Sequence, residues 1–471
     1  MLRRLVVRNF RAFTNADLQL APITIIAGAN SSGKTSLLQA LNCVLQSRSE
    51  RSFPFDFVLN GSLAQLGSYR NAVYGHDARH SFGVSVEFSA RDVEYEASGT
   101  FKDSEEDSRY LFPKSVVCNA SKLGRLTLDW NHRRGIFQLR VNENRPAILE
   151  DRGRMYEIFT PILRASAEGQ SQDLPPSLSG LSIRDAQDVS KLREIVNIGL
   201  QQMPSSMSST SASFDDAIKE FQKHPLFTPI RNELLVALDR QRRETFYLGP
   251  VRANPSRYYP VARQSFVLDP FGESMSHMLT FWKERRSQAF NEVKQALVKL
   301  ELASDISAQV ELGEFLKLLI KPSGRLFSDS IADVGFGVSQ ILPMLVADAA
   351  LPVGGVLLVN QPEIHLHPSS QALIADYFAE RIQKRQYIVE THSEYLINRL
   401  RLLVAKGTIN ESDVKIFYCG ALSDGAPKGV TEVRIRKSGV LEGMPKEFFA
   451  TYAGDAFKLA MSVMEQDDAS Q

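Results

Sequence analysis

Hydrophobic and polar positions follow two different periods in the first part of the chain. Residues 2–9 alternate, and residues 18–28 form a turn followed by an apolar run, which predicts two β-strands, the second of them buried. Residues 34–47 then change to helical spacing, with an apolar face of Leu37, Leu38, Ala40, Leu41 and Leu45. The pattern predicts a strand, a short loop and a helix in direct succession.

Later segments repeat these two patterns. Residues 82–101 and 121–148 are rich in β-formers and contain turn signals. The last third alternates between short apolar runs and helical spacing, which predicts a parallel α/β sheet. Its expected elements are helical spacing over 270–301, a strand at 353–360, a helix at 369–384, a strand at 386–390, a helix at 394–405, a strand at 414–420 and a helix at 444–466.

After about residue 165 the amino-acid composition becomes rich in Ser, Pro and Gly, and this change indicates a boundary between parts of the chain. The stretches SAEGQSQDLPPSLSG and MPSSMSSTSASFDD are rich in Ser, Pro and Gly, and they flank a helical segment near 184–203. We therefore expect a helical insertion at 150–243 between an N-terminal part, 1–149, and a C-terminal part, 244–471.

Overall charge and cysteine content exclude several classes of protein. Lys and Arg number 55 against 54 Asp and Glu, so a nucleic-acid-binding surface over the whole protein is not expected. The cysteines, Cys43, Cys118 and Cys419, are far apart and fit a reducing cytoplasm. No run of 18 apolar residues occurs, so we expect no membrane span.

The segment GANSSGKTS fits the pattern G-x-x-x-x-G-K-[ST] and lies between a predicted strand and a predicted helix, as this motif requires. Its glycines let backbone N–H groups turn inward, and these groups and the helix N-terminus hold phosphate oxygens. Lys34 reaches the β- and γ-phosphates, and the Thr35 hydroxyl can ligate Mg²⁺. The flanking elements disfavour a chance Gly/Ser loop. The predicted phosphate site comprises Gly28, Ala29, Asn30, Ser31, Ser32, Gly33, Lys34, Thr35 and Ser36.

Three downstream stretches occur in an order that chance explains poorly. DVGFGVSQILPML (333–345) is a Gly-rich turn that leads into an apolar helix. NQPEIHLHP (360–368) and VETHSEYL (389–396) each contain the end of a predicted strand. Alone, each has an ordinary interpretation as a helix cap or a loop. Together with the phosphate loop, they favour a nucleotide site.

Two further groups of residues keep alternatives open. His365 and His367 have no further ligand candidates, so turn packing, or for His367 a dimer interface, is favoured over a metal site. Arg252 and Arg257, beside two tyrosines, could bind phosphate or a partner. Packing and surface ion pairs explain these arginines equally well.

With these motifs the chain resembles the RecF/OLD-type ABC ATPases of bacteria, which have SMC-like heads. The resemblance extends to NFRAF, NGSLAQLGSYRNAV and YLGPVRANPSRYY, and leaves about 150–240 uncovered. Within this group the chain is most similar to the ATPase subunit of the Septu anti-phage system, which partners an HNH nuclease. The resemblance implies an α/β fold, an ABC-type P-loop NTPase head with a β-rich N-terminal lobe, and ATP and Mg²⁺ as ligands.

The resemblance also implies roles for residues outside the phosphate loop. Gly337 and Ser339 belong to the signature segment, which caps the γ-phosphate bound by a second subunit. His392 takes the place of the switch histidine, and Arg11 in NFRAF is expected in the nucleotide site. Because ATP lies between two heads in such proteins, we expect a homo-oligomer built from dimeric heads.

Two amides occupy the positions of acids in the resembled pattern. Asn360 aligns with the acid that holds Mg²⁺ through water, and Gln361 aligns with the glutamate that activates the attacking water. Neither side chain carries charge, and loss of a general base typically costs about 10²–10⁴ in rate. Glu363 is a candidate replacement base, and a glutamine can position water in some GTPases. We expect ATP binding with weak or absent hydrolysis.

Three hypotheses about function follow. The first is an ATP-binding scaffold that oligomerises and controls an effector nuclease in phage defence. This nuclease belongs to a partner, because no D-x-D metal motif follows His392. The second is an active RecF-like ATPase in DNA repair or genome maintenance, with DNA as a partner. The third is a regulatory ATP sensor.

Overall fold

In the computed structural model, contacts divide the chain into two units. The first comprises Met1, residues 12–39 and residues 242–471, and the second comprises residues 2–11 and 40–241. The predicted division at 150 and 244 remains a prediction. The described residues are 1–47, 52–104, 111–150, 193, 197, 200–201, 203–211, 213–261, 268–311, 313–420 and 429–443. Most of the segment near 184–203 and the predicted helix at 444–466 lie outside them.

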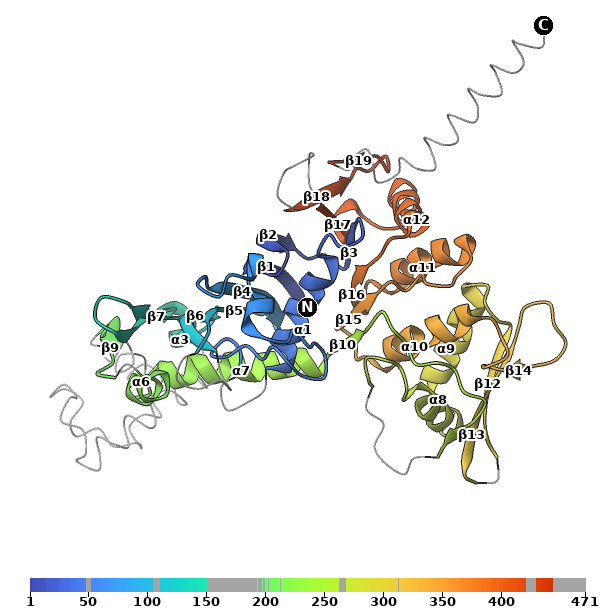
Figure 1. Ribbon diagram of the computed structural model, residues 1–471, viewed down its shortest axis with the longest axis horizontal. Coiled ribbons are helices and arrows are strands. Elements are labelled where there is room, and N and C mark those ends of the chain that lie inside the picture. Colours follow the sequence, from blue (N-terminus) through green and yellow to red (C-terminus); the bar gives the residue numbers. More distant parts are fainter. Residues whose placement is uncertain are drawn as a thin grey trace, which may run out of the picture. The chain divides into compact units, whose positions relative to one another are not determined.

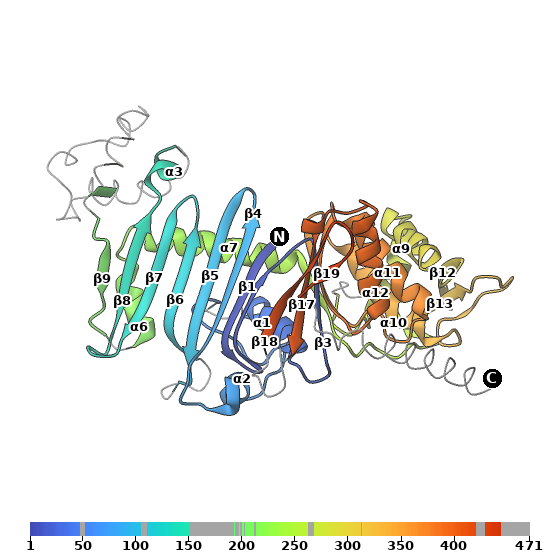
Figure 2. The same cartoon turned by 90° about the horizontal axis from the view of Figure 1, so that it is seen from above.

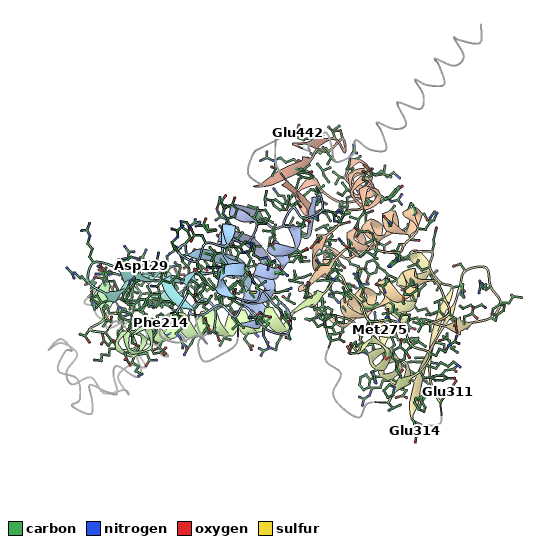
Figure 3. All side chains as sticks on the ribbon, viewed as in Figure 1. Asp129, Phe214, Met275, Glu311, Glu314 and Glu442 are labelled. Atoms are coloured by element: carbon green, nitrogen blue, oxygen red, sulfur yellow. The ribbon has the colours of Figure 1, made fainter. Side chains whose placement is uncertain are left out.

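The first unit contains a seven-stranded sheet in the order β10-β15-β16-β3-β17-β18-β19 (Figure 1). Its first five strands are parallel, and β18 and β19 continue it in antiparallel pairs. Glu442, which is labelled in Figure 3, lies at its antiparallel edge. Its carboxylate forms an ion pair with Arg436 at 2.6 Å. The strands are β3 (Ile23–Gly28), β10 (Thr245–Leu248), β15 (Gly355–Asn360), β16 (Arg385–Glu390), β17 (Val414–Gly420), β18 (Gly429–Ile435) and β19 (Leu441–Glu442). The predicted parallel sheet is confirmed.

Helices connect these strands and share one apolar core with them. The strands β3, β15 and β16 are buried at every position, which explains the mainly apolar sequences of β3 and β15 and the apolar centre of β16. The core is formed by side chains of this sheet, a smaller sheet and five helices. The helices are α8 (Met275–Glu284), α9 (Gln288–Lys299), α10 (Phe336–Ala350), α11 (Pro368–Arg381) and α12 (Glu394–Ala405).

The smaller sheet has the order β11-β13-β12, and β14 also pairs with β13. All its strands are antiparallel, and the β12–β13 hairpin is the longest pairing in it. This sheet was not predicted from the sequence. Its strands are β11 (Tyr259–Pro260), β12 (Asp305–Glu311), β13 (Phe315–Lys321) and β14 (Asp329–Ser330). The first unit also contains β2 (Phe13–Gln19) and η3 (Glu411–Asp413).

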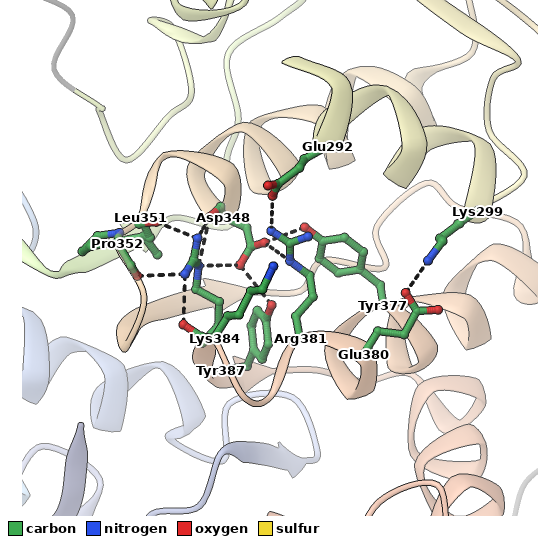
Figure 4. Close-up of polar contacts among 11 residues, drawn as sticks. Glu292, Lys299, Asp348, Leu351, Pro352, Tyr377, Glu380, Arg381, Lys384 and Tyr387 are labelled. Atoms are coloured by element: carbon green, nitrogen blue, oxygen red, sulfur yellow. Dashed lines mark hydrogen bonds and ion pairs between the residues drawn. The ribbon is translucent and has the colours of Figure 1, made fainter. Parts of the chain in front are cut away.

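A buried ionic cluster joins α10, α11 and β16 of the first unit (Figure 4). Asp348 on α10 is fully buried, and its carboxylate lies 2.6 Å from Nε of Arg381 and 3.5 Å from Nε of Arg385. It also accepts hydrogen bonds from the hydroxyls of Tyr377 (2.7 Å) and Tyr387 (3.0 Å). Burial, together with the Asp348 charge, raises the pKa of both tyrosines, so they remain neutral donors. One carboxylate thus holds two arginines and two tyrosines.

The second unit is built on an antiparallel sheet with the strand order β1-β4-β5-β6-β7-β8-β9 (Figure 2). Alternating burial along β5 explains the period-two pattern of this part of the sequence. Phenylalanine rings at 10, 53, 57, 82 and 101 pack together in its core. The strands are β1 (Leu2–Phe10), β4 (Phe82–Ala90), β5 (Val93–Lys102), β6 (Phe112–Ala120), β7 (Gly124–Asn131), β8 (Ile136–Glu143) and β9 (Ser206–Ser208).

The predicted β-rich N-terminal lobe is confirmed by this sheet. The helices of the second unit are α2 (Tyr69–Ala72), η1 (Tyr74–His76), α3 (Arg145–Glu150) and α6 (Phe214–Phe221). Helix α7 (Phe227–Arg243) lies mostly in this unit, and α1 (Lys34–Gln46) begins in the first unit and continues into the second. No described helix is long and apolar enough to span a bilayer.

Candidate functional site: a phosphate loop at the carboxyl ends of parallel strands

The predicted phosphate loop connects β3 to α1. Gly28 ends the strand, and Lys34 is the first residue of the helix. The tip of the loop is exposed at Ala29, Asn30 and Ser31, whereas Ser32, Lys34 and Ser36 are buried. The predicted order of strand, loop and helix is confirmed. It places the backbone N–H groups of a helix start at the open side of the loop, where they can bind an anion.

Lys34 folds back over the loop. Its ammonium group donates hydrogen bonds to the carbonyl oxygens of Gly28 (3.1 Å) and Ala29 (2.7 Å). Burial lowers the pKa of Lys34, and the nearby charge of Glu390 partly offsets this effect. A phosphate oxygen would satisfy the same ammonium group better than two neutral carbonyls, because hydrogen bonds between charged groups are stronger.

Gly28 has a positive φ angle, and its surroundings leave no space for a side chain. Its φ is +145°, and a Cβ atom there would lie 2.2 Å from the carbonyl oxygen of Cys419 and 3.0 Å from Oγ of Ser32. Cys419 is the partner of Gly28 across the β3–β17 pairing, so the conflicting oxygen belongs to a sheet strand that cannot move freely. Both the dihedral angle and the neighbouring strand therefore exclude a side chain at this position.

We expect Gly28→Ala to lower the free energy of unfolding by about 3 kcal/mol or more, because backbone strain and overpacking act together. Gly407→Ala is the matched control. Gly407 also has a positive φ (+70°), but no atom of the described residues lies within 4 Å of the place that a Cβ would occupy. Its cost should be limited to roughly 1–2 kcal/mol for the backbone angle. Urea titration followed by Trp282 fluorescence in a Trp130→Phe background compares the two, and equal losses would contradict the packing argument.

The hydroxyl of Thr35 contacts the end of β16. It donates a hydrogen bond to Oε1 of Glu390 (2.9 Å), the last residue of β16. The side-chain amide of Asn360, the last residue of β15, donates to Oε2 of the same carboxylate (2.5 Å). Burial raises the pKa of Glu390, and the hydrogen bond from Thr35 works in the opposite direction. The two predicted metal-site residues, Thr35 and Asn360, are thus brought together by a third residue.

Glu390 was not assigned a role from the sequence. The signal that could have identified it is an acidic residue at the end of an otherwise buried strand, one residue before the predicted Thr-His turn. A carboxylate in this position is energetically costly unless it is hydrogen-bonded or binds a cation. Glu390 has hydrogen bonds from Thr35 and Asn360, so its burial is accounted for.

The turn after β15 carries the predicted catalytic residues. Gln361 has a positive φ of 44°, and its backbone N–H donates to the carbonyl oxygen of Glu390 (2.6 Å). Arg252 donates to the carbonyl oxygens of Asn360 (2.8 Å) and Gln361 (3.4 Å). Burial lowers the pKa of Arg252 to about 10, partly offset by the charge of Glu363. Arg252 is therefore explained by its packing against this turn and not by an exposed phosphate-binding surface. Arg257 forms an ion pair with Asp333.

Glu363 and His392 lie together. The backbone N–H of His392 donates to Oε1 of Glu363 (2.8 Å), which joins the turn after β15 to the turn after β16. Burial raises the pKa of Glu363, and this hydrogen bond partly offsets the rise. Burial lowers the pKa of His392, and the charge of Lys34 adds to this effect. The structure thus places Glu363 as a support for the histidine turn.

Gly337 and Ser339 lie on α10, and Arg11 lies in the second unit. Gly337 is in the first turn of α10, and a Cβ there would lie 3.0 Å from the carbonyl oxygen of His365. The hydroxyl of Ser339 is buried and donates to the carbonyl oxygen of Phe336 (2.9 Å). Arg11 belongs to the second unit, where its backbone N–H donates to Ala72 (2.8 Å). The signature segment therefore packs against the turn after β15 within the first unit.

His365 and His367, the two histidines considered as metal ligands, lie in the turn between β15 and α11. His367 caps α11, with its ring nitrogen 2.9 Å from Oγ of Ser369. In the described part of the chain, no group of three or more His, Cys, Asp or Glu side chains could hold a metal ion by itself.

The phosphate loop and the end of β15 each contain a buried side-chain oxygen without a hydrogen-bond partner. Among the described residues, Oγ of Ser32 and Oδ1 of Asn360 are buried and have no hydrogen-bond partner. An unsatisfied buried polar atom is costly, and such atoms in a native protein often face a ligand, ion or water. Ser32 belongs to the phosphate loop, and Asn360 touches the carboxylate beside it. These residues fit a hydrated cation and a phosphate.

Known proteins share parts of this sequence. The chain is 48% identical over 62 residues to an OLD nuclease of Thermus scotoductus, which covers 12% of each chain. It is 29% identical over 147 residues to the DNA replication and repair protein RecF of Citrobacter koseri, covering 27% of this chain and 38% of RecF. The chain thus spans well under half the length of either relative. A crystal structure of an Smc head bound to the C-winged helix domain of ScpA aligns with 93% of this chain and 99% of its own, at 11% identity and a TM-score of 0.43.

The sequence profile of the AAA ATPase domain matches residues 1–109 and 264–397. The first stretch contains the phosphate loop, and the second contains α10, the turn after β15 and His392. The predicted fold class, a mixed α/β P-loop ATPase head, is confirmed by this match and by the sheet order. Because the two matched stretches make up more than half of the chain, this protein belongs to the AAA ATPase domain family.

Proposed function

We propose that this ATPase-family protein binds Mg²⁺-ATP between two of its heads, hydrolyses it weakly or not at all, and thereby controls a partner effector nuclease. One observation carries the proposal. The phosphate loop has its lysine and its hydroxyl in place, while a neutral Gln361 lies where the resembled ATPases have a general base. ATP binding depends on Lys34 and Thr35, whereas ATP hydrolysis depends on the residue at 361. The protein can therefore bind ATP without hydrolysing it.

Binding is explained by the loop. Lys34 would exchange its carbonyl partners for phosphate oxygens, and the N–H groups at the start of α1 would hold the same phosphate. Bound Mg²⁺ would neutralise phosphate charge, with the hydroxyl of Thr35 and a water held by Asn360 as the predicted ligands. Ser32 offers its buried unpartnered hydroxyl to the same ligand.

Weak hydrolysis follows from the turn after β15. A carboxamide at 361 can orient a water but cannot accept its proton. Glu363 is a poor substitute, since its Oε1 atom already accepts the N–H of His392 and the side chain is buried. A general base usually contributes about 10²–10⁴ in rate, so its loss leaves a slow enzyme.

The effect on assembly follows from slow turnover. In the resembled ATPases the nucleotide lies between two heads, and the segment around Gly337 and Ser339 contacts the phosphate of the second head. ATP that is not hydrolysed would hold such a dimer closed. The partner expected from the motif resemblance to the Septu ATPase subunit is an HNH nuclease, and one protein that shares sequence with this chain is named a nuclease.

The proposal predicts that the purified protein binds ATP tightly, releases phosphate far below about 1 s⁻¹ and forms larger assemblies with ATP. Binding should be measured by isothermal titration calorimetry, turnover by phosphate release and size by light scattering. Lys34→Ala should weaken binding by at least about 100-fold, since it removes the charge that reaches the phosphates. Lys406→Ala, at the exposed end of α12, is the matched control. Turnover at ordinary rates that Lys34→Ala abolishes would contradict the proposal.

A second candidate is an active RecF-like ATPase that acts on DNA in repair or genome maintenance. The partial identity to RecF supports it. It requires contacts with DNA phosphates, and such contacts make affinity fall steeply with salt concentration. Binding to a duplex with a steep salt slope, together with DNA-stimulated phosphate release, would favour this function over the scaffold.

A further inference from the structure

The carboxyl end of β16 lies between the two strands that frame the nucleotide site. In the sheet order β15-β16-β3, the strand β3 leads to the phosphate loop and β15 ends at Asn360. A side chain at the end of β16 is therefore adjacent to both. Glu390 occupies this position, is 3% exposed, and is hydrogen-bonded on one side to Thr35 and on the other to Asn360.

We propose that Glu390 is the carboxylate that positions the Mg²⁺ of the bound nucleotide, in place of the acid that position 360 lacks. This inference rests on the proposed binding of ATP and changes the predicted ligand set. The hydroxyl of Thr35 keeps its predicted role. Asn360 becomes the residue that orients Glu390.

The distance between the two oxygens fits this role. Two oxygens that occupy neighbouring positions around an octahedral Mg²⁺, each at 2.0–2.1 Å, are about 2.9 Å apart. Oγ1 of Thr35 and Oε1 of Glu390 are 2.9 Å apart. The pair therefore has the spacing of adjacent ligands without any movement of the backbone, and the proton between them would turn away when a cation arrives.

The amide at 360 is complementary to this carboxylate. Nδ2 of Asn360 donates to Oε2 of Glu390 at 2.5 Å, and an aspartate there would place two carboxylates in contact, which repel each other. Oδ1 of Asn360 remains buried and without a partner among the described residues. It can accept a hydrogen bond from a water on the cation. The neutral residue at 360 thus fixes the acid and still serves the metal through water.

Glu363 does not compete for this role. Its Oε1 atom holds the backbone of His392, and its charge lies close to Arg252. Glu390, by contrast, has Lys34 and Thr35 of the phosphate loop as its neighbours. Of the two buried glutamates, Glu390 is therefore the one that contacts the predicted metal ligand.

The test measures how strongly Mg²⁺ enhances ATP binding, by calorimetry in excess Mg²⁺ and in excess EDTA. Glu390→Gln is expected to reduce the ratio of the two affinities about 10–100-fold, the usual effect of losing a group that positions a metal. ATP binding in EDTA should not weaken, since the substitution removes negative charge beside the phosphates. This second value also shows that the variant keeps a folded phosphate loop.

Two further variants sharpen the result. Glu380→Gln removes a carboxylate from the exposed ion pair with Lys299 and should leave the ratio unchanged. Asn360→Asp combined with Glu390→Gln returns the acid to position 360 and should recover Mg²⁺ enhancement that Glu390→Gln alone has lost. An unchanged ratio in Glu390→Gln would overturn the assignment of Glu390. Absence of ATP binding by the wild-type protein in both buffers would instead overturn the proposed function.

Discussion

Replacing Asp348 with alanine is expected to lower the free energy of unfolding of the first unit by about 3–5 kcal/mol. The carboxylate is fully buried and lies within ion-pair distance of Arg381 and Arg385. Its removal takes a counter-charge from both arginines. It also leaves the hydroxyls of Tyr377 and Tyr387 without the acceptor that they have now. Arg385 also donates to the main-chain carbonyls of Leu351 and Pro352, so it cannot easily turn to solvent.

The readout can be confined to the first unit. The chain has 2 tryptophans, of which Trp282 lies in the first unit on α8 and Trp130 in the second on β7. A Trp130→Phe background therefore lets Trp282 fluorescence report urea unfolding of the first unit alone. Asp305→Ala is the control, because Asp305 pairs with Lys294 while 45% exposed and should contribute only about 0–1 kcal/mol. Similar losses for both variants would show that the Asp348 cluster does not stabilise the unit.

Replacing Gln361 with glutamate is expected to raise the rate of ATP hydrolysis by about 10²–10⁴. Glutamate has the length of glutamine, and the backbone of residue 361 is fixed by the carbonyl of Glu390 and by Arg252. The new carboxylate should therefore take the place of the amide and accept the proton of the attacking water. Single-turnover phosphate release at saturating ATP separates this step from binding.

Two control variants test whether the increase in hydrolysis comes from the new carboxylate at position 361. Gln361→Ala removes the amide without adding a base, so it should not raise turnover. Lys34→Ala combined with Gln361→Glu should abolish the gain, which excludes a contaminating ATPase. If Gln361→Glu turned over ATP no faster than the wild-type protein, the missing base would not be the cause of slow hydrolysis.

Much of the first unit could be predicted because its local patterns are strong. Strands β3, β15 and β16 are buried throughout and have apolar residues at their centres, and each was predicted within a few residues. The phosphate loop combines a sequence pattern with a required strand and helix, both of which the structure contains. The strands and the phosphate loop could be predicted because each is formed by residues that follow one another in the sequence.

Glu390 and Asp348 could not be assigned because their environments depend on distant segments. The partners of Glu390 come from residues 35 and 360, and only the position of β16 between β3 and β15 brings them together. The sequence predicts parallel strands but not their order. The smaller sheet was also missed, although β13 alternates between buried and more exposed positions, a pattern that could have identified it.

The left-handed backbone of Gln361 has a consequence for how the protein can change between states. A non-glycine residue at φ 44° would relax by rotating the peptide planes on its two sides. Arg252 and the Glu390 carbonyl hold the plane before it, and Arg252 also holds the plane after it. These three hydrogen bonds disfavour other conformations of the turn. A nucleotide can shift populations only among segments that have alternatives, so we expect the conformational response to ATP to arise outside residues 360 and 361.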